Sequence, residues 1–269
     1  MEQYFKLISG HRLHYEQRGD PRSLSPPIVF LNGLSQSTLA WHGVIDAGLV
    51  DFNCICVDLL FQGKSDSPKQ FRSFEQHADD LNELLQDLGH PKYILTGISY
   101  GGAVAQRYMA KYPDKIQKAF LVSTFGNKDA YFNAIGASWK KALKLGGYDL
   151  MFDVMLPLVV GRSYFLDPVI PIDTLRAAKA NMSPATEDLL YLMEATEKSE
   201  DSFLNELSHV PVETIVVQGE EDFLCSPEMG QAIADALPKG KFILFKKYGH
   251  TLNLEAVPKL ASLIREHCV

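Results

Sequence analysis

Several features that mark whole classes of proteins are missing from this sequence. Its apolar runs fall short of the ~20 residues that a membrane helix needs, and residues 1–6 lack the apolar core of a secretory signal. Lysine and arginine form no block, and the formal net charge is −7, which argues against nucleic acid as a partner. We therefore expect a cytoplasmic protein without a membrane span or a nucleic-acid partner.

Cysteine is also scarce, with four residues in a chain of 269. Cys54 and Cys56 flank Ile55 in an apolar run that predicts a buried strand, and strand residues two apart share a face. This pattern indicates packing residues of a reduced protein rather than a disulfide framework. No group of histidine, cysteine and acidic residues has the sequence spacing of metal ligands, so we expect neither a metal nor another cofactor.

What the sequence does contain is an alternation of short apolar runs with helical patterns. Continuous apolar strands separated by helices are typical of α/β proteins with a mostly parallel sheet that helices cover on both faces. A looser alternation over residues 5–18 predicts an N-terminal hairpin that adds two strands. The buried strands are predicted at residues 28–31, 54–57, 93–96, 119–122, 214–217 and 242–245.

The alternation stops between residues 126 and 208. This stretch has helical patterns and no convincing strand, and Pro157, Pro168, Pro171 and Pro184 are expected to divide it into short helices. We interpret it as a helical lid inserted after the sixth strand. The predicted core then consists of residues 1–125 and 209–269, and the predicted lid (cap) of residues 126–208.

The candidate nucleophile lies in the sequence Gly97-Ile98-Ser99-Tyr100-Gly101, which joins an apolar strand to a helix rich in small residues. In this context G-x-S-x-G is a nucleophile elbow, a sharp turn that holds a serine in a strained conformation at the end of a strand. A side chain at either glycine would collide with the neighbouring strand or helix. The pattern therefore predicts Ser99 as a nucleophile, although a structural serine can carry the same pattern by chance.

A serine hydroxyl needs a base to remove its proton and a third group to orient that base. His250 follows the last predicted strand and Asp222 follows the strand before it. Both therefore fall at carboxyl ends of strands, where open α/β sheets bind their ligands. The order serine, aspartate, histidine is also the order of elbow-bearing folds. Glu220, Glu221 and Asp129 remain alternatives for the acid.

The anion that forms on attack needs hydrogen-bond donors, an oxyanion hole. We predict that the backbone N–H groups of Tyr100, directly after the nucleophile, and of Leu34, after the strand at 28–31, supply them. A lid over the site has one face available for substrate, so some of its aromatic residues are expected to line a pocket. The residues predicted to contact the substrate are Asn32, Trp139, Phe152 and Phe223.

Together these motifs resemble the motif set of the α/β-hydrolase superfamily. The likeness spans nearly the whole chain in the right order, and it is closest to the lid-bearing branch of esterases, enol-lactonases, C–C hydrolases and cofactor-free haloperoxidases. It implies Ser99 as nucleophile, Asp222 as acid and His250 as base. The motifs are the elbow at residues 97–102, Asp58-x-x-x-x-Gly63-x-Ser65, Gly219-x-x-Asp222 and Gly249-His250-x-x-x-x-Glu255.

The leading hypothesis is a serine hydrolase that cleaves a carboxylic ester, lactone or thioester of a small-molecule acyl substrate. Many members of the superfamily carry His-Gly where this chain has Asn32-Gly33. That departure is similar to bacterial acyltransferases that make or move 3-hydroxyacyl groups from a carrier protein. The alternative is therefore an acyltransferase that uses an acyl carrier protein or coenzyme A thioester. A third hypothesis is a non-catalytic member of the fold that binds a ligand.

Overall fold

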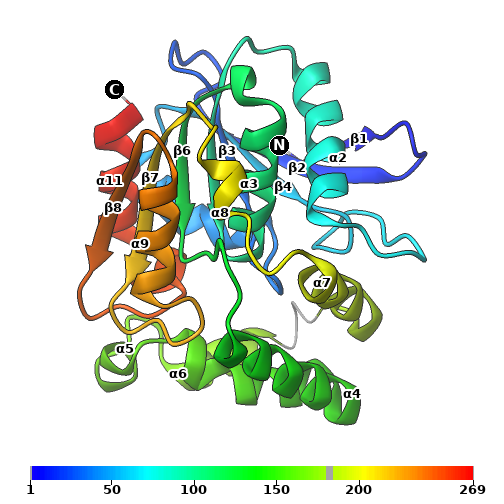
Figure 1. The fold of residues 1–269 in the computed structure, drawn as a ribbon, viewed down its shortest axis with the longest axis vertical. Coiled ribbons are helices and arrows are strands. Elements are labelled where there is room, and N and C mark those ends of the chain that lie inside the picture. The colour runs from blue at the N-terminus through cyan, green and yellow to red at the C-terminus, as the bar shows by residue number, and fades with distance from the viewer. Residues whose placement is uncertain (1, 180–183, 269) are drawn as a thin grey trace.

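The fold is built around an 8-stranded sheet with the strand order β1-β2-β4-β3-β5-β6-β7-β8 (Figure 1). The structure, a computed structural model, describes residues 2–179 and 184–268. The strands are β1 (Glu2–Lys6), β2 (Arg12–Gly19), β3 (Ile28–Leu31), β4 (Asn53–Asp58), β5 (Tyr93–Ile98), β6 (Ile116–Val122), β7 (Glu213–Gly219) and β8 (Gly240–Phe245).

The pairing of the strands confirms the predicted sheet. β1 and β2 form the N-terminal antiparallel hairpin, and β2 pairs antiparallel with β4. All pairs from β4 to β8 are parallel. The carboxyl ends of β3, β5, β6, β7 and β8 therefore lie at one edge of the sheet, where an open α/β sheet places its ligand site.

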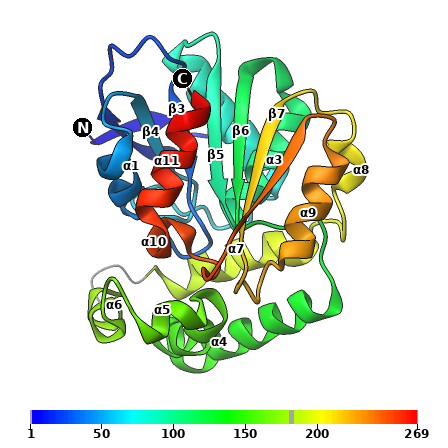
Figure 2. The same ribbon diagram turned by 90° about the vertical axis from the view of Figure 1, so that its left-hand side faces the viewer.

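Helices cover both faces of the sheet (Figures 1 and 2). α2 (Phe74–Leu88), α3 (Tyr100–Lys111) and α9 (Pro227–Ala236) pack on one face. α1 (His42–Gly48) and α11 (Val257–Cys268) pack on the other. Shorter elements are the 3-10 turns η1 (Thr38–Trp41) and η2 (Pro113–Lys115) and the single-turn helix α10 (Leu252–Glu255).

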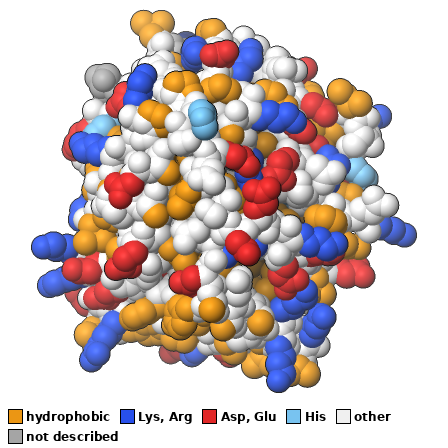
Figure 3. Space-filling view, in the orientation of Figure 1, with side chains coloured by type: hydrophobic (Ala, Val, Ile, Leu, Met, Phe, Trp, Pro, Cys, Tyr) orange, Lys and Arg blue, Asp and Glu red, His pale blue; other side chains and the backbone are white. Residues whose placement is uncertain are grey.

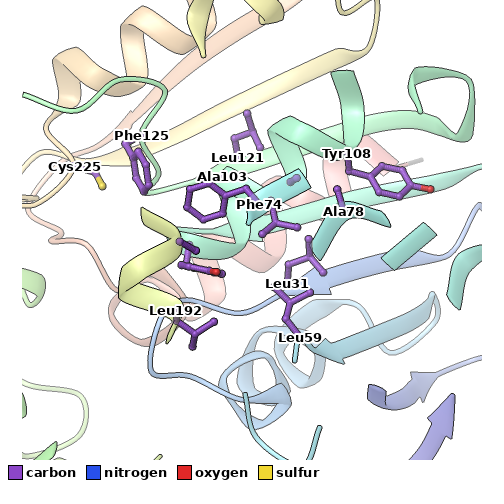
Figure 4. Packing of buried hydrophobic residues seen from close by; sticks show 14 of the residues in the cluster. Leu31, Leu59, Phe74, Ala78, Ala103, Tyr108, Leu121, Phe125, Leu192 and Cys225 are labelled. Carbon is purple, nitrogen blue, oxygen red and sulfur yellow. The ribbon is translucent and has the colours of Figure 1, made fainter. Parts of the chain in front are cut away.

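Alternate residues of the central strands enter the two apolar clusters between these layers. Cys54 and Cys56 face the α1 side and Ile55 faces the α2 side, so the two cysteines share a face as predicted, and both are free. In Figure 4 the cluster on the α2 side extends from Leu31 and Leu121 of the sheet to Leu192 beyond the sheet edge. Burial of each large apolar side chain stabilises the fold by about 1.5–3 kcal/mol.

Local sequence signals set several helix ends. At the start of α2 the Gln76 N–H donates to Ser73 Oγ (3.3 Å), and the Ser73 N–H donates to Gln76 Oε1 (2.9 Å), which completes the expected capping box. Gly89 ends that helix in the left-handed region with φ 73°. Both devices position α2 against α3, the helix that follows Ser99.

Residues 126–208, which we call the helical insertion, leave the sheet after the sixth strand and return to the seventh. Figure 2 shows most of the insertion beneath the carboxyl ends of the strands. Its last helix instead packs beside α9 and α3. The helices are α4 (Ala130–Val159), α5 (Arg162–Leu166), α6 (Ile172–Lys179), α7 (Thr186–Lys198) and α8 (Leu204–Leu207).

The expectation that Pro157 breaks a helix is wrong. Pro157 lies inside α4, close to its C-terminal end, so it removes one hydrogen bond of the last turns without ending the helix. The interruption falls instead at Gly146 and Gly147, and Gly147 has φ 65°, a value that suits glycine. None of the helices in residues 2–179 and 184–268 combines the length and the apolarity that crossing a bilayer requires.

The two ends of the insertion are hydrogen-bonded to each other in a short antiparallel stem. Asn127 and Ser202 form an isolated β-bridge. The Lys128 N–H donates to the Asp201 carbonyl, and the Phe203 N–H donates to the Gly126 carbonyl, both at 2.8 Å. The insertion therefore begins and ends at one point of the molecule.

Candidate active site

Ser99 occupies the turn between β5 and α3 in a strained conformation, with φ 52° and ψ −116°. Its N–H donates to the Val122 carbonyl (3.0 Å), and its carbonyl accepts from Thr124 Oγ1 (2.8 Å). A Cβ at Gly97 would meet the Gly101 backbone, and a Cβ at Gly101 would meet the Leu31 carbonyl. The predicted elbow is therefore the observed local geometry, and both glycines are required by close backbone approach.

His250 and Asp222 are joined by a hydrogen bond at the same edge of the sheet. The distance from His250 Nδ1 to Asp222 Oδ2 is 2.8 Å, and both side chains are buried. Asp222 follows β7 and His250 follows β8, so the parallel neighbours β7 and β8 bring them together. His250 and Ser99 line the same small cavity. Because Nδ1 is on the carboxylate, the predicted role of His250 as a base falls to its other ring nitrogen, Nε2.

The Asp222 carboxylate is held by four donors. Oδ1 accepts from the N–H groups of Leu224 (3.0 Å) and Cys225 (2.9 Å), and Oδ2 accepts from Gln218 Nε2 (2.9 Å) as well as from the imidazole. These bonds fix the carboxylate against the His250 ring.

The alternative acids all accept hydrogen bonds from groups other than His250. Glu221 accepts from the Ser163 hydroxyl (2.6 Å) and Ser163 N–H (2.7 Å). Glu220 accepts from the Lys247 N–H (3.1 Å). Asp129 caps α4 by accepting from the Phe132 N–H (2.7 Å). Of the four candidate carboxylates, Asp222 is the one bonded to His250.

Two cavities flank Ser99, one of about 310 Å³ and one of about 60 Å³. Leu34, Trp139 and Leu224 line both, and Tyr100 lines the larger. Trp139 is buried, and its indole Nε1 has no hydrogen-bond partner within the described part of the chain. A bound acceptor would satisfy that donor, since buried polar groups are nearly always paired.

The predicted oxyanion donors lie beside the nucleophile. Tyr100 is the first residue of α3, and the first N–H groups of a helix have no acceptor within it. Leu34 follows Gly33. The N–H of Gly33 donates to Gln36 Oε1 (3.1 Å), so it is not available to a substrate oxygen. The oxyanion hole formed by the N–H groups of Tyr100 and Leu34 stays a prediction.

Of the four residues predicted to contact substrate, Trp139 lines both cavities and the other three lie elsewhere. Asn32 is fully buried, and its Nδ2 donates to the Val57 carbonyl and to Asp58 Oδ1, both at 3.0 Å. Phe152 packs against the Tyr148 ring. Phe223 is 52% exposed beside Asp222. Asn32 thus ties the ends of β3 and β4 together instead of facing the cavities.

Burial keeps two neighbouring groups out of proton chemistry. It raises the pKa of the Tyr100 hydroxyl well above the ordinary tyrosine value. Burial, with the nearby Asp222 charge, likewise raises the pKa of the Cys225 thiol. Both groups are therefore protonated at neutral pH.

In Figure 3 basic and acidic side chains are interspersed over the visible face.

One group of potential metal ligands lies on the hairpin: Glu2, His14 and Glu16 are close together. All three side chains already have cationic or hydrogen-bonding partners, and His14 Nδ1 is hydrogen-bonded to Asp58 Oδ2 at 2.7 Å. Lys64 pairs with Glu2, and Glu16 accepts from Thr38 and pairs with His42. We assign no metal to this group.

The structure adds residues that the sequence analysis did not single out. Gln218 orients Asp222, and Leu224 lines both cavities. A glutamine at the end of an otherwise apolar strand was a visible signal for the first. Nothing in the local sequence marked Leu224, because its role depends on how the β7–α9 loop folds back over Ser99.

The sheet order, the elbow and the helical insertion define a class of protein. The family model for the alpha/beta hydrolase fold matches residues 26–145, and a solved structure similar to this chain over almost its whole length is an alpha/beta hydrolase enzyme. The chain therefore has the α/β-hydrolase fold.

Individual relatives are distant. The first curated relatives, uncharacterized proteins of Mycobacterium, are 28% identical over 157 residues, and the chain spans 43% of their length. Lipase 3 of a Moraxella species is 26% identical over 95% of this chain and 81% of its own.

Solved structures are similar over almost the whole chain. MGS-M2, an alpha/beta hydrolase enzyme from a Medee basin deep-sea metagenome library, gives a TM-score of 0.88 at 21% identity, covering 98% of this chain and 96% of its own. The enol-lactonase from Burkholderia xenovorans LB400 gives 0.86 at 20% identity and covers 98% of each chain.

Proposed function

We propose that this chain is a serine hydrolase that cleaves an ester-type bond through an acyl-enzyme on Ser99. The observation that carries the proposal is the 2.8 Å hydrogen bond from His250 to Asp222, with His250 lining the same cavity as the strained Ser99. A nucleophile, a base and an orienting anion in this relation are the parts that acyl transfer needs. The helical insertion then acts as a cap over the site.

In the first half of the reaction, Ser99 Oγ attacks the substrate carbonyl while His250 Nε2 takes its proton. Asp222 stabilises the imidazolium that forms, and its own fixed hydrogen bonds keep it from moving. The negative charge on the carbonyl oxygen rests on the N–H groups of Tyr100 and Leu34. His250 returns the proton to the leaving oxygen, and the carbon–oxygen bond breaks.

In the second half, water takes the place of the departed group beside His250. The imidazole accepts a proton from water, and the hydroxide attacks the acyl carbon. Collapse of the second tetrahedral intermediate releases the acid and returns the proton to Ser99. Esters follow this course. In a thioester the proton goes to sulfur and the carbon–sulfur bond breaks, and in a lactone the leaving oxygen stays attached to the acyl group, so the product is a hydroxy acid. The names of the lipase relative and of the structurally similar enol-lactonase agree with such bonds.

Two further hypotheses from the sequence have less support. An acyltransferase that uses a carrier-protein or coenzyme A thioester would place a long thiol arm beside His250, and the cavity of about 60 Å³ there covers only ~two or three of its atoms. A binding protein without catalysis has no use for the strain at Ser99. Hydrolysis is therefore the function that we assign.

The test is a serine-directed fluorophosphonate together with proton-release assays on methyl esters of increasing acyl length. The parent protein is expected to gain one phosphonate adduct on Ser99 and to release acid, and Ser99→Ala is expected to do neither. Thermal unfolding of both proteins checks that the variant is folded. A parent that shows no adduct and no Ser99-dependent hydrolysis across the series would remove the proposal.

A further inference from the structure

The two cavities at Ser99 differ about fivefold in volume, 310 Å³ against 60 Å³. Leu34, Ser99, Trp139 and Leu224 line both of them. An ester has one substituent on each side of the carbonyl carbon that a serine attacks. The two cavities are therefore the two places that these substituents can take.

The position of His250 determines which cavity takes the alcohol group of the ester and which takes the acyl group. The proton that the imidazole takes from serine goes to the oxygen of the leaving alcohol, so the alcohol must depart beside the imidazole. His250 and Thr251 line the small cavity, and neither is among the described residues that line the large one. The small cavity is thus on the alcohol side, and the large cavity is on the acyl side.

The volume of each cavity indicates how many non-hydrogen atoms of a substrate it can cover. A dry cavity of about 150 Å³ holds one benzene ring. By the same measure the small cavity, with about 60 Å³ of space, covers ~two or three non-hydrogen atoms, and a longer group extends into the solvent to which both cavities open. The large cavity of about 310 Å³ holds ~twelve. A methyl or ethyl group fits the first, and a medium-length acyl chain fits the second.

The large cavity has more apolar than polar lining surface, although Asn133, Thr196, Glu197 and Asp201 also line it. Its basic residue, Lys128, is committed elsewhere, because Nζ donates to the carbonyl oxygens of Thr196 (2.9 Å) and Ser199 (2.8 Å) at the end of α7. The lining therefore presents no unpaired lysine or arginine within the described residues that would call for an anionic acyl group. The large apolar side chains of the lining are Phe125, Phe132, Trp139 and Met193.

We propose that the substrates are esters of a very small alcohol, methanol or ethanol, with a mainly hydrocarbon acyl group of medium length. This inference rests on the acyl-enzyme mechanism proposed above. Ser99 Oγ bonds to the acyl carbon as the bond to the small alkoxide breaks, and the alkoxide takes the proton held by His250. Water then supplies hydroxide to the acyl carbon and a proton that passes through His250 back to Ser99. The products are a carboxylic acid and the small alcohol.

Trp139 forms part of the boundary between the two cavities. It lies on α4, it is buried, and it lines both spaces. Removal of its ring should open space toward the alcohol side. Replacement by phenylalanine should keep an aromatic wall there.

The test compares two esters of equal composition, methyl octanoate and heptyl acetate. They are constitutional isomers, so they differ in which side of the carbonyl carries the long chain. Acid release is followed by titration at constant pH with the parent protein and with Ser99→Ala. The expected result is a kcat/KM at least about tenfold higher for methyl octanoate, because the heptyl group exceeds the small cavity by several methylenes.

The outcomes separate the inference from the proposed function. Ser99-dependent hydrolysis of both isomers at equal rates, or faster hydrolysis of heptyl acetate, leaves the serine hydrolase standing and overturns the cavity assignment. Absence of Ser99-dependent hydrolysis of either isomer, together with absence of phosphonate labelling, overturns both.

Two variants of Trp139 test the wall separately. Trp139→Ala is expected to lower the preference for methyl octanoate about tenfold, and Trp139→Phe is expected to keep most of it. Both variants are first compared with the parent by circular dichroism and thermal unfolding. If Trp139→Ala does not fold, the isomer pair with the parent and Trp139→Phe still decides the assignment. A folded Trp139→Ala with the parent's preference would contradict the role given to this wall.

Discussion

Glu255 holds Gly161 and Gly249 through a single carboxylate oxygen. Oε2 accepts from the Gly161 N–H at 3.0 Å and from the Gly249 N–H at 2.9 Å. Oε1 accepts from the N–H (3.1 Å) and the hydroxyl (2.8 Å) of Thr251. Gly161 belongs to the helical insertion and Gly249 precedes His250, so one buried side chain joins the insertion to the loop of the proposed base.

A second contact supports the same loop from the insertion. The N–H groups of His250 and Thr251 both donate to the carbonyl of Val159, the last residue of α4, each at 3.1 Å. The position of His250 therefore depends on the end of α4 as well as on β8. Changes at this junction should affect both stability and catalysis.

Glu255→Gln should lower the free energy of unfolding by about 2 kcal/mol, because buried hydrogen bonds to a charged acceptor are lost and an amide N–H₂ faces other donors. Hydrolysis should fall as well, since the His250 loop loses its anchor. Urea unfolding and the methyl ester assay measure the two effects. The control is Glu187→Gln, the same change of charge at an exposed position of α7. Equal effects of the two substitutions would contradict the anchoring role.

Gly161→Ala should also disturb this junction. A Cβ at residue 161 would lie 2.7 Å from the Gly249 nitrogen and 3.0 Å from Glu255 Oε2, closer than carbon atoms approach such groups. We expect a loss of about 1–3 kcal/mol of stability from the forced backbone shift. Gly136→Ala, also in the insertion, is the matched control, because nothing lies within 4 Å of its added Cβ. That control should gain about 0.5–1 kcal/mol, as Gly to Ala does in a helix.

Asp222→Asn should reduce kcat for the ester about 10³–10⁴-fold with the fold retained. The amide neither stabilises the imidazolium nor holds the required tautomer of His250. Steady-state kinetics and circular dichroism measure the change. Glu221→Gln alters the adjacent carboxylate, which is bonded to Ser163 rather than to His250. A comparable loss of kcat in Glu221→Gln would argue against Asp222 as the acid of this site.

His77 should make the protein less stable in mild acid. Burial, with a smaller contribution from Arg72, lowers the pKa of His77 from 6.5 to about 3 in the folded protein. The unfolded chain therefore takes up a proton below pH 6.5 that the folded chain refuses until about pH 3. Its contribution to the free energy of unfolding is fully present above pH 6.5 and decreases by about 1.4 kcal/mol for each pH unit below it.

The substitution His77→Leu removes this titration. Urea unfolding at several pH values between 7 and 4 should show a shallower decline for the variant than for the parent. His209→Gln, at an exposed position, should leave the parent's slope unchanged. Identical slopes for the parent and His77→Leu would show that His77 takes up its proton while folded.

The parts of the fold and the site that could be predicted are those with local causes. The elbow at Ser99 needs its glycines because of backbone contacts a few residues away, and the capping box at Ser73 and Gln76 satisfies the start of its own helix. Asp222 and His250 could be placed together because parallel strands end at a common edge. Each of these inferences required only the immediate sequence and the direction of the strands.

The rest depends on packing between distant segments. Asn32 turns toward Asp58 rather than into the cavities because the end of β4 offers it two acceptors. His77 belongs to a helix whose polar residues fall partly on the inner face, so its burial could not be read from the pattern. Pro157 lies within α4, and the interruption of that helix falls at Gly146 and Gly147 instead.

The stem at residues 126–128 and 201–203 has a consequence for how such a protein can change. The insertion leaves and re-enters at one clamped point, so its length can vary at little entropic cost and without altering the register between β6 and β7. In evolutionary terms the insertion is a cassette, a segment that can be exchanged as a unit. A new cassette would bring new cavity walls to an unaltered Ser99 and Asp222, provided that it kept an acceptor at Val159 and a residue without a side chain at Gly161.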